Sequence, residues 1–210
     1  MNVNKVSDYI EKAKEVLKQK TFSPLMCNIR ADQFEEYLYG YYERETRKNG
    51  SVIDVLNAKH LCRQLIDAVN YPKSTIIAIM ITGGVGTGKT TLLRAFRNML
   101  LHAVNDGMRV PVPSPIINAT NLLECARPNN QYATFIDDVG TEPAEMMLYG
   151  NARKPFREWC EISYERKFPF VFTTNLNPQS MRERYGDRAF DRLREVCAIV
   201  TAKGTSYRGK

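Results

Sequence analysis

Long apolar runs are missing from this 210-residue sequence. The longest, residues 76–81, is far too short to span a bilayer. The start, MNVNKVSDYIEKAKE, also lacks the apolar segment of a secretory signal peptide. We therefore expect a cytoplasmic protein with no membrane partner.

Cysteine is scarce, and its pattern excludes two kinds of site. The chain has five cysteines, which are odd in number, widely spaced and without a C-x-x-C pair: Cys27, Cys62, Cys125, Cys160 and Cys197. Such a pattern argues against a disulfide framework and against a zinc site. Internal repeats and low-complexity tracts are also absent. We expect reduced cysteines in the core of one main domain.

Positive charge is concentrated near the C-terminus. The formal net charge of the chain is +7, and residues 146–210 carry +6 of it, with 13 basic residues against 7 acidic ones. A local surplus of this kind suits contact with phosphate, either of nucleic acid or of a nucleotide on a neighbouring subunit. A solvated basic face is the alternative.

Helical periodicity dominates the first third of the chain. Apolar residues at 3, 6, 10, 13 and 17 predict a helix over residues 3–20 with a narrow apolar stripe, which either packs on its own domain or docks on a partner helix. Two further helices are expected at 32–48, with Asp32 as N-cap, and at 51–70, with Ser51 as N-cap.

Strands and helices alternate after residue 72. The expected strands are 74–82, 114–120, 132–138, 168–175 and 197–202, and the expected helices are 90–105, 155–167 and 178–195. Continuous apolar runs such as STIIAIMIT are typical of strands buried on both faces of a parallel sheet. The pattern predicts a three-layer α/β domain with right-handed crossovers.

Residues 83–90, GGVGTGKT, match the phosphate-loop pattern G-x-x-x-x-G-K-[ST] between an expected strand and an expected helix. Its glycines let successive backbone N–H groups point at phosphates, Lys89 would reach the β- and γ-phosphates, and the Thr90 hydroxyl would hold Mg²⁺. The nucleotide-binding residues expected here are Gly83, Gly84, Val85, Gly86, Thr87, Gly88, Lys89, Thr90 and Thr91. A glycine-rich turn without a nucleotide is the alternative.

Two aspartates follow the apolar run in TFIDDVG. A carboxylate at the C-terminal end of a parallel strand can bind Mg²⁺ through water, which predicts that role for Asp137. Asp138 is then placed to polarise the attacking water as a general base. An Asp-Asp turn without a catalytic task is the alternative. Because a strand and a helix lie between the two motifs, we expect the acidic strand to lie next to the loop strand after a detour, as in additional-strand ATPases.

Asn175 ends the strand VFTTN. An amide in the same row of strand ends as Asp137 can orient the hydrolytic water or sense the γ-phosphate, although asparagine also caps helices and forms turns.

RERYGDRAFDRLRE places three arginines four residues apart, Arg184, Arg188 and Arg192. On one helical face they would form a cationic strip. An arginine supplied across a subunit boundary to the γ-phosphate accelerates hydrolysis greatly. The acidic residues of the same segment offer a plain salt-bridge ladder as the alternative.

The motifs GGVGTGKTT, FIDDVGTEP, TTN, YGDRAFDRLRE and KGTSYR follow one another in an order that resembles the AAA+ ATPases of the DnaC/IstB type, from about residue 56 to Arg208. The resemblance implies that Lys89 and Thr90 act as Walker A ligands. The other implied roles are Walker B for Asp137 and Asp138, sensor 1 for Asn175, arginine finger for Arg192 with Arg188 second, and a less defined role for Arg208. Asp138 departs from the commoner glutamate of the wider class.

The resemblance also implies an organisation. Residues 1–22 would form a short helical extension that binds a partner, and 23–210 a P-loop NTPase domain of the AAA+ ASCE type with a five-stranded parallel sheet and no C-terminal helical lid. The segment 124–131 is short for this family, so DNA-contacting positions there do not transfer.

The implied function is that of a helicase loader. It would bind ATP and Mg²⁺, hydrolyse ATP, form homo-oligomers on ATP or DNA, and engage single-stranded DNA and a replicative hexameric helicase. Tyr149, Asn151, Arg153 and Lys154 offer stacking and phosphate contacts to DNA. The alternatives are an IstB-like partner of a transposase on duplex DNA, a small-molecule P-loop kinase, and an adaptor that binds ATP without turnover.

Overall fold

The computed structural model describes residues 31–70, 76–107, 110–122, 132–148 and 150–203. The helix expected over residues 3–20 lies outside these ranges, as do Cys27, Cys125 and Arg208. Within the described parts of the chain, no helix is long and apolar enough to cross a membrane.

Two helices precede the sheet, as predicted: α2 (Ala31–Lys48) and α3 (Val55–Val69). Their expected N-caps are wrong. Asp32 lies inside the first turn of α2, and α3 begins after Asp54, whose carboxylate accepts a hydrogen bond from the Asn57 N–H at 3.1 Å. Capping at Asp54 leaves residues 49–54 as a connection between the two helices.

The predicted five-stranded parallel sheet is confirmed. Its strands are β1 (Ala78–Gly83), β2 (Val112–Asn118), β3 (Tyr132–Val139), β6 (Phe170–Thr174) and β7 (Cys197–Ala202). They lie in the order β2-β3-β6-β1-β7. The expectation that the acidic strand lies next to the loop strand is wrong, because β6 lies between β3 and β1 and pairs with both. The chain does form another strand, β2, between the phosphate loop and the acidic strand, and β2 lies at the edge of the sheet beside β3.

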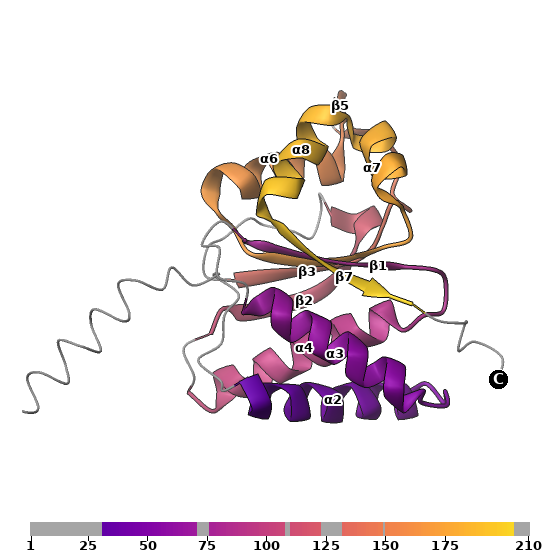
Figure 1. Cartoon of the computed structure of the whole chain (residues 1–210). Helices are drawn as coiled ribbons and strands as arrows, with labels where there is room; N and C mark the ends of the chain where they lie inside the picture. Colours follow the sequence, from indigo (N-terminus) through magenta and orange to yellow (C-terminus); the bar gives the residue numbers. More distant parts are fainter. Residues whose placement is uncertain (1–30, 71–75, 108–109, 123–131, 149, 204–210) are drawn as a thin grey trace, which may run out of the picture.

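Helices cover both faces of this sheet (Figure 1). On one face α2 and α3 lie with α4 (Lys89–Asn105), and on the other lie α6 (Pro155–Arg166), α7 (Pro178–Tyr185) and α8 (Asp187–Val196). Alternate residues of β1 pack into different cores: Ile79 and Ile81 face the first group of helices, and Ala78 and Met80 face the second. This is the three-layer α/β domain expected from the alternation of elements.

The predicted helix 178–195 is two helices. Gly186 separates α7 from α8 with φ +84°, and its N–H donates to the Arg182 carbonyl at 2.9 Å. Positive φ carries no steric cost for glycine, so the chain turns here and starts a new helix. Consequently Arg184 lies on α7, and the expected strip of three arginines on one helix is wrong.

Three short elements were not expected. A 3₁₀ turn, η1 (Ala119–Asn121), follows β2, and β4 (Met146–Leu148) pairs antiparallel with β5 (Asn151–Arg153). This hairpin follows the acidic strand and leads into α6, whose N-cap is Lys154.

Candidate nucleotide and magnesium site

A cavity of about 540 Å³ lies at the carboxyl ends of the central strands. The predicted site residues that line it are Val85, Gly86, Gly88, Lys89, Thr90, Thr91, Asp137, Asp138 and Asn175. They come from the β1–α4 loop, the end of β3 and the end of β6. The topology therefore brings together side chains that are far apart in the sequence, at the edge where parallel α/β sheets bind ligands.

Two glycines of the loop have no room for a side chain. At Gly83 (φ +146°) a Cβ would lie 2.2 Å from the Ala202 carbonyl oxygen. At Gly88 (φ +90°) it would lie 2.2 Å from the Tyr42 hydroxyl on α2. The loop is thus held between β7 and α2, with its backbone free to approach a bound anion.

Lys89 is the first residue of α4 and is buried. Its Nζ donates to the Gly83 and Gly84 carbonyl oxygens at 2.9 and 2.6 Å. A buried ammonium group at the N-terminus of a 17-residue helix adds to the positive potential of that terminus. This part of the cavity suits a triphosphate.

A hydroxyl and a carboxylate meet at the side of the loop. The Thr90 hydroxyl donates to Asp137 Oδ1 at 3.0 Å, and the Thr173 hydroxyl of β6 donates to the same oxygen at 2.6 Å. Hard oxygen donors of this kind suit Mg²⁺, which binds through one or two protein ligands, phosphate oxygens and water. The donor set therefore fits the expected magnesium site, with Thr173 as a neighbour that the sequence motifs did not indicate.

Asp138 has a strained backbone. Its φ is +59°, its N–H donates to the Thr173 hydroxyl at 2.8 Å, and its carbonyl accepts from the Thr141 hydroxyl at 2.7 Å. A non-glycine residue in this region costs about 1–3 kcal/mol and is found mostly at functional sites. Asp138 lines the cavity, as does Asn175, which follows β6 directly.

Segments outside the motifs complete the cavity. Asn49 and residues 51–54 line it from the α2–α3 connection, together with Tyr42 of α2 and Arg94 of α4. Val52 and Val85 are exposed at 69% and 63%, which gives the mouth an apolar surface suited to a planar base. Sequence reasoning missed these residues because no local pattern connects them to the phosphate loop.

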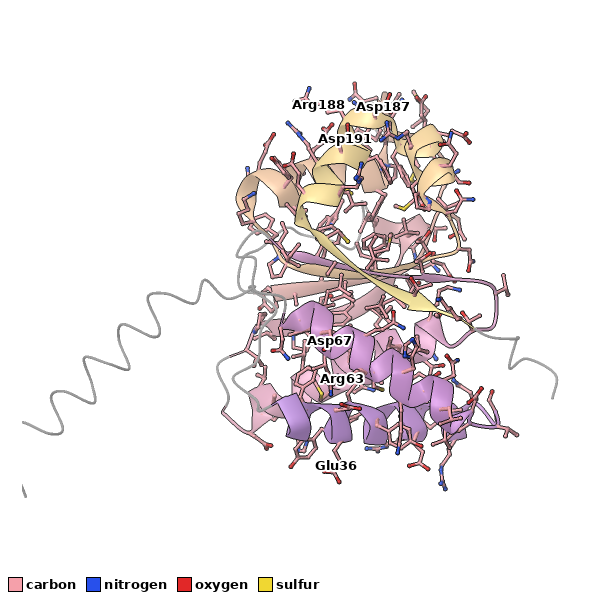
Figure 2. All side chains as sticks on the ribbon, in the orientation of Figure 1. Glu36, Arg63, Asp67, Asp187, Arg188 and Asp191 are labelled. Atoms are coloured by element: carbon pink, nitrogen blue, oxygen red, sulfur yellow. The ribbon has the colours of Figure 1, made fainter. Side chains whose placement is uncertain are left out.

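The two candidate arginine fingers are not among the residues that line the cavity of their own chain. Arg192 is largely covered: its guanidinium lies 5.2 Å from the centroid of the Tyr164 ring and 3.9 Å from Glu165. Arg188 is exposed on α8, and Figure 2 shows it at the outer end of that helix. Within the described ranges no acidic side chain pairs with Arg188.

The acidic residues of this segment have other partners. Asp187 and Asp191 accept from Arg182 at 2.6 and 3.3 Å, and Glu195 accepts from the Tyr164 hydroxyl at 2.6 Å. The salt-bridge ladder therefore involves Arg182, and it leaves Arg188 outside.

The expected DNA contacts lie on the β4–β5 hairpin and its exit. Arg153 forms an ion pair with Glu158, which holds the pKa of that carboxyl below its ordinary value, and Lys154 pairs with Glu145 at 2.8 Å. Asn151 is exposed, and Tyr149 lies outside the described residues. Both cations thus have local partners, and a role in DNA binding stays a prediction.

No protein-family model and no curated protein sequence matches the chain. Its structure is similar to several solved structures of low sequence identity. The crystal structure of DnaI has 18% identity, covers 75% of this chain and 86% of its own, and has a TM-score of 0.49. The DnaC helicase loader has 15% identity, coverages of 70% and 91%, and a TM-score of 0.49.

The third is a protein from Streptococcus pyogenes serotype M3 described as "a putative primosome component", with 14% identity, coverages of 75% and 86%, and a TM-score of 0.51. This likeness concerns the fold alone. The chain therefore has the P-loop α/β fold that its motifs predicted.

Proposed function

We propose that this protein is an ATPase that hydrolyses ATP to ADP and phosphate with Mg²⁺. One observation carries the proposal: a single cavity contains the Lys89 ammonium group, the Thr90–Asp137 oxygen pair, the strained Asp138 and the Asn175 amide. These are the groups that phosphoryl transfer to water needs, and the cavity also has an apolar mouth for the base.

Each side chain has one task. Lys89 binds the β- and γ-phosphates, and Thr90 and Asp137 hold Mg²⁺, which supplies positive charge to the phosphate oxygens when bound. Asp138 accepts a proton from the attacking water, while Asn175 orients that water. The water oxygen bonds to the γ-phosphorus as the bond to the ADP oxygen breaks.

Hydrolysis takes place at a boundary between two copies of the chain. Among the described residues, Arg94 is the arginine that lines the cavity, and the two candidate arginine fingers, Arg188 and Arg192, lie on α8, outside it. We infer that one of them completes the site of a neighbouring copy. Arg192 is the residue that the motif favours, whereas Arg188 has the freer side chain.

The biological role proposed is that of a loader for a replicative hexameric helicase on single-stranded DNA. Support comes from the order of the motifs, from the fold shared with the streptococcal primosome component and from the basic C-terminal third. The DNA-bound, ATP-bound form would be a homo-oligomer, and hydrolysis would release it.

The test is phosphate release measured against protein concentration, with and without single-stranded DNA, for the wild type and for Asp138→Asn. We expect specific activity to rise with concentration and the variant to lose it. Absence of turnover by the wild type would identify an adaptor that only binds ATP. Constant specific activity would identify an enzyme active as a monomer. Preference for duplex DNA together with stimulation by a transposase would identify the IstB-like role.

A further inference from the structure

A buried carboxylate lies close in the sequence to the cavity-lining Asp138 but does not line the cavity itself. Glu142 is 1% exposed and follows Asp138 by four residues. Confining a carboxylate away from water costs several kcal/mol unless other groups compensate its charge. Because Glu142 has almost no contact with water, the groups around it must compensate its charge.

Both oxygens of Glu142 are used. Oε2 accepts from the Gly140 N–H at 2.7 Å, and Oε1 accepts from the Tyr185 hydroxyl at 2.5 Å. Arg184 adds its charge, with Nε 3.9 Å from Oε1, and donates through Nη2 to the Glu142 carbonyl. Burial, and then the hydrogen bond to Glu142, raise the pKa of Tyr185, so its hydroxyl remains a donor.

The backbone held in this way is the turn that carries Asp138. Gly140 has φ +105°, and a Cβ there would lie 2.8 Å from the Leu176 side chain. The turn is closed by the Thr141 N–H, which donates to the Asp138 carbonyl at 3.1 Å. Glu142 thus links this turn to the last turn of α7, where Arg184 and Tyr185 lie.

We propose that Glu142 is a positioning residue for the hydrolytic step: anchored by Tyr185 and Arg184, it holds the Gly140 N–H and keeps Asp138 in its left-handed conformation. This inference rests on the proposed ATPase function. A misplacement of about 1 Å at a reacting group lowers a rate by up to about a hundredfold. The loss falls on kcat, because the phosphate loop that binds ATP is untouched.

The experiment compares Glu142→Gln with Glu158→Gln. Glu158 is the matched control, because it also pairs with an arginine, Arg153, and also accepts from a backbone N–H, that of Lys154, but outside the cavity. We expect kcat of Glu142→Gln to fall between about tenfold and about a hundredfold, with KM for ATP and affinity for a fluorescent ATP analogue unchanged. Glu158→Gln should keep the wild-type kcat.

Two further variants keep the inference falsifiable if Glu142→Gln does not fold. Tyr185→Phe removes only the hydroxyl, and should lower kcat in the same direction at unchanged KM. In an Asp138→Asn background, Glu142→Gln should cause no further loss in single-turnover hydrolysis, because its effect acts through Asp138. The inference is overturned if kcat is the same in Glu142→Gln, Tyr185→Phe and wild type. It is also overturned if the rate losses of Glu142→Gln and Asp138→Asn are fully additive in the double variant. Either result leaves the ATPase proposal standing. Lack of hydrolysis by the wild type overturns both.

Discussion

The hydroxyl of Thr173 lies 2.6 Å from Asp137 Oδ1 and also accepts a hydrogen bond from the Asp138 N–H at 2.8 Å. One side chain of β6 therefore contacts both acidic residues of β3. This contact joins the two neighbouring strands at the point where the metal ligand and the proposed general base meet.

Replacing Thr173 by valine keeps the shape and removes both hydrogen bonds. We expect the free energy of unfolding to fall by about 1–3 kcal/mol, because the hydrogen bond from the Asp138 N–H is lost in a partly buried position. The Mg²⁺ concentration for half-maximal hydrolysis should rise, since Asp137 loses a donor that orients it. Urea unfolding and a Mg²⁺ titration of phosphate release measure the two effects.

Thr134→Val is the control for that substitution, because Thr134 is also a buried threonine of the sheet, on β3, and lies outside the cavity. Its Mg²⁺ titration should match the wild type. The same Mg²⁺ requirement in Thr173→Val and wild type would show that Thr173 does not orient the metal ligand.

Gly88→Ala tests the packing of the phosphate loop. A Cβ at this position meets the Tyr42 hydroxyl at 2.2 Å in addition to a φ of +90°. Both effects act against the native loop, so we expect loss of nucleotide binding, which titration with a fluorescent ATP analogue measures. Gly107→Ala provides the control: Gly107 has φ +79° with nothing within 4 Å of a Cβ.

The control variant should lose about 1–2 kcal/mol of stability from backbone strain and keep its nucleotide affinity. In Gly88→Ala, Tyr42→Phe should restore part of the binding, because it removes the oxygen that meets the Cβ. Wild-type affinity in Gly88→Ala alone would contradict the close approach of α2 to the loop.

The sequence predicted the sheet well because a parallel sheet depends on local patterns, and most of the motif residues do line one cavity. Apolar runs mark buried strands of a parallel sheet, and the phosphate loop takes its shape from its own glycines. The break at Gly186 was missed because a single glycine is tolerated inside a helical pattern, and only its φ shows the turn. Ser51 and Asp54 are both good N-caps, so sequence could not choose between them.

Contacts between distant elements could not be predicted. Tyr42 approaches Gly88 from α2, Thr173 reaches Asp137 from the neighbouring strand, and Val52 lies at the mouth of the cavity. Each depends on how α2, α3 and β6 pack against the loop and β3. A motif fixes which residues bind phosphate but not which other segments enclose it.

The ion pair of Glu158 with Arg153 predicts a dependence of stability on pH. The hydrogen bond from Arg153 lowers the pKa of Glu158 below its ordinary value of 4.5. The pair therefore stabilises the fold above that value, and the contribution is lost as the pH falls through the lowered pKa. The difference in urea midpoint between wild type and Glu158→Gln should be present at pH 7 and shrink below about pH 4. An equal difference at both pH values would contradict the ion pair.

Mixing variants can show which of the two candidate arginines, Arg188 or Arg192, is the arginine finger. Asp138→Asn lacks the general base but keeps its arginines, whereas Arg188→Ala keeps its own site and lacks the arginine. If Arg188 acts on a neighbour, an equimolar mixture contains boundaries with an intact site and an intact arginine. Phosphate release by that mixture should then exceed the sum of the two variants measured alone.

A mixture of Asp138→Asn with Arg192→Ala tests the other candidate in the same way. Arg192→Ala also removes the contacts with Tyr164 and Glu165, at a cost of about 0.5–1 kcal/mol, so the assay temperature must keep each variant folded. Recovery of activity with only one of the two arginine variants assigns the finger to that residue, because the other acts elsewhere. If neither mixture exceeds the sum of its components while the wild type hydrolyses ATP, α8 does not complete a neighbouring site.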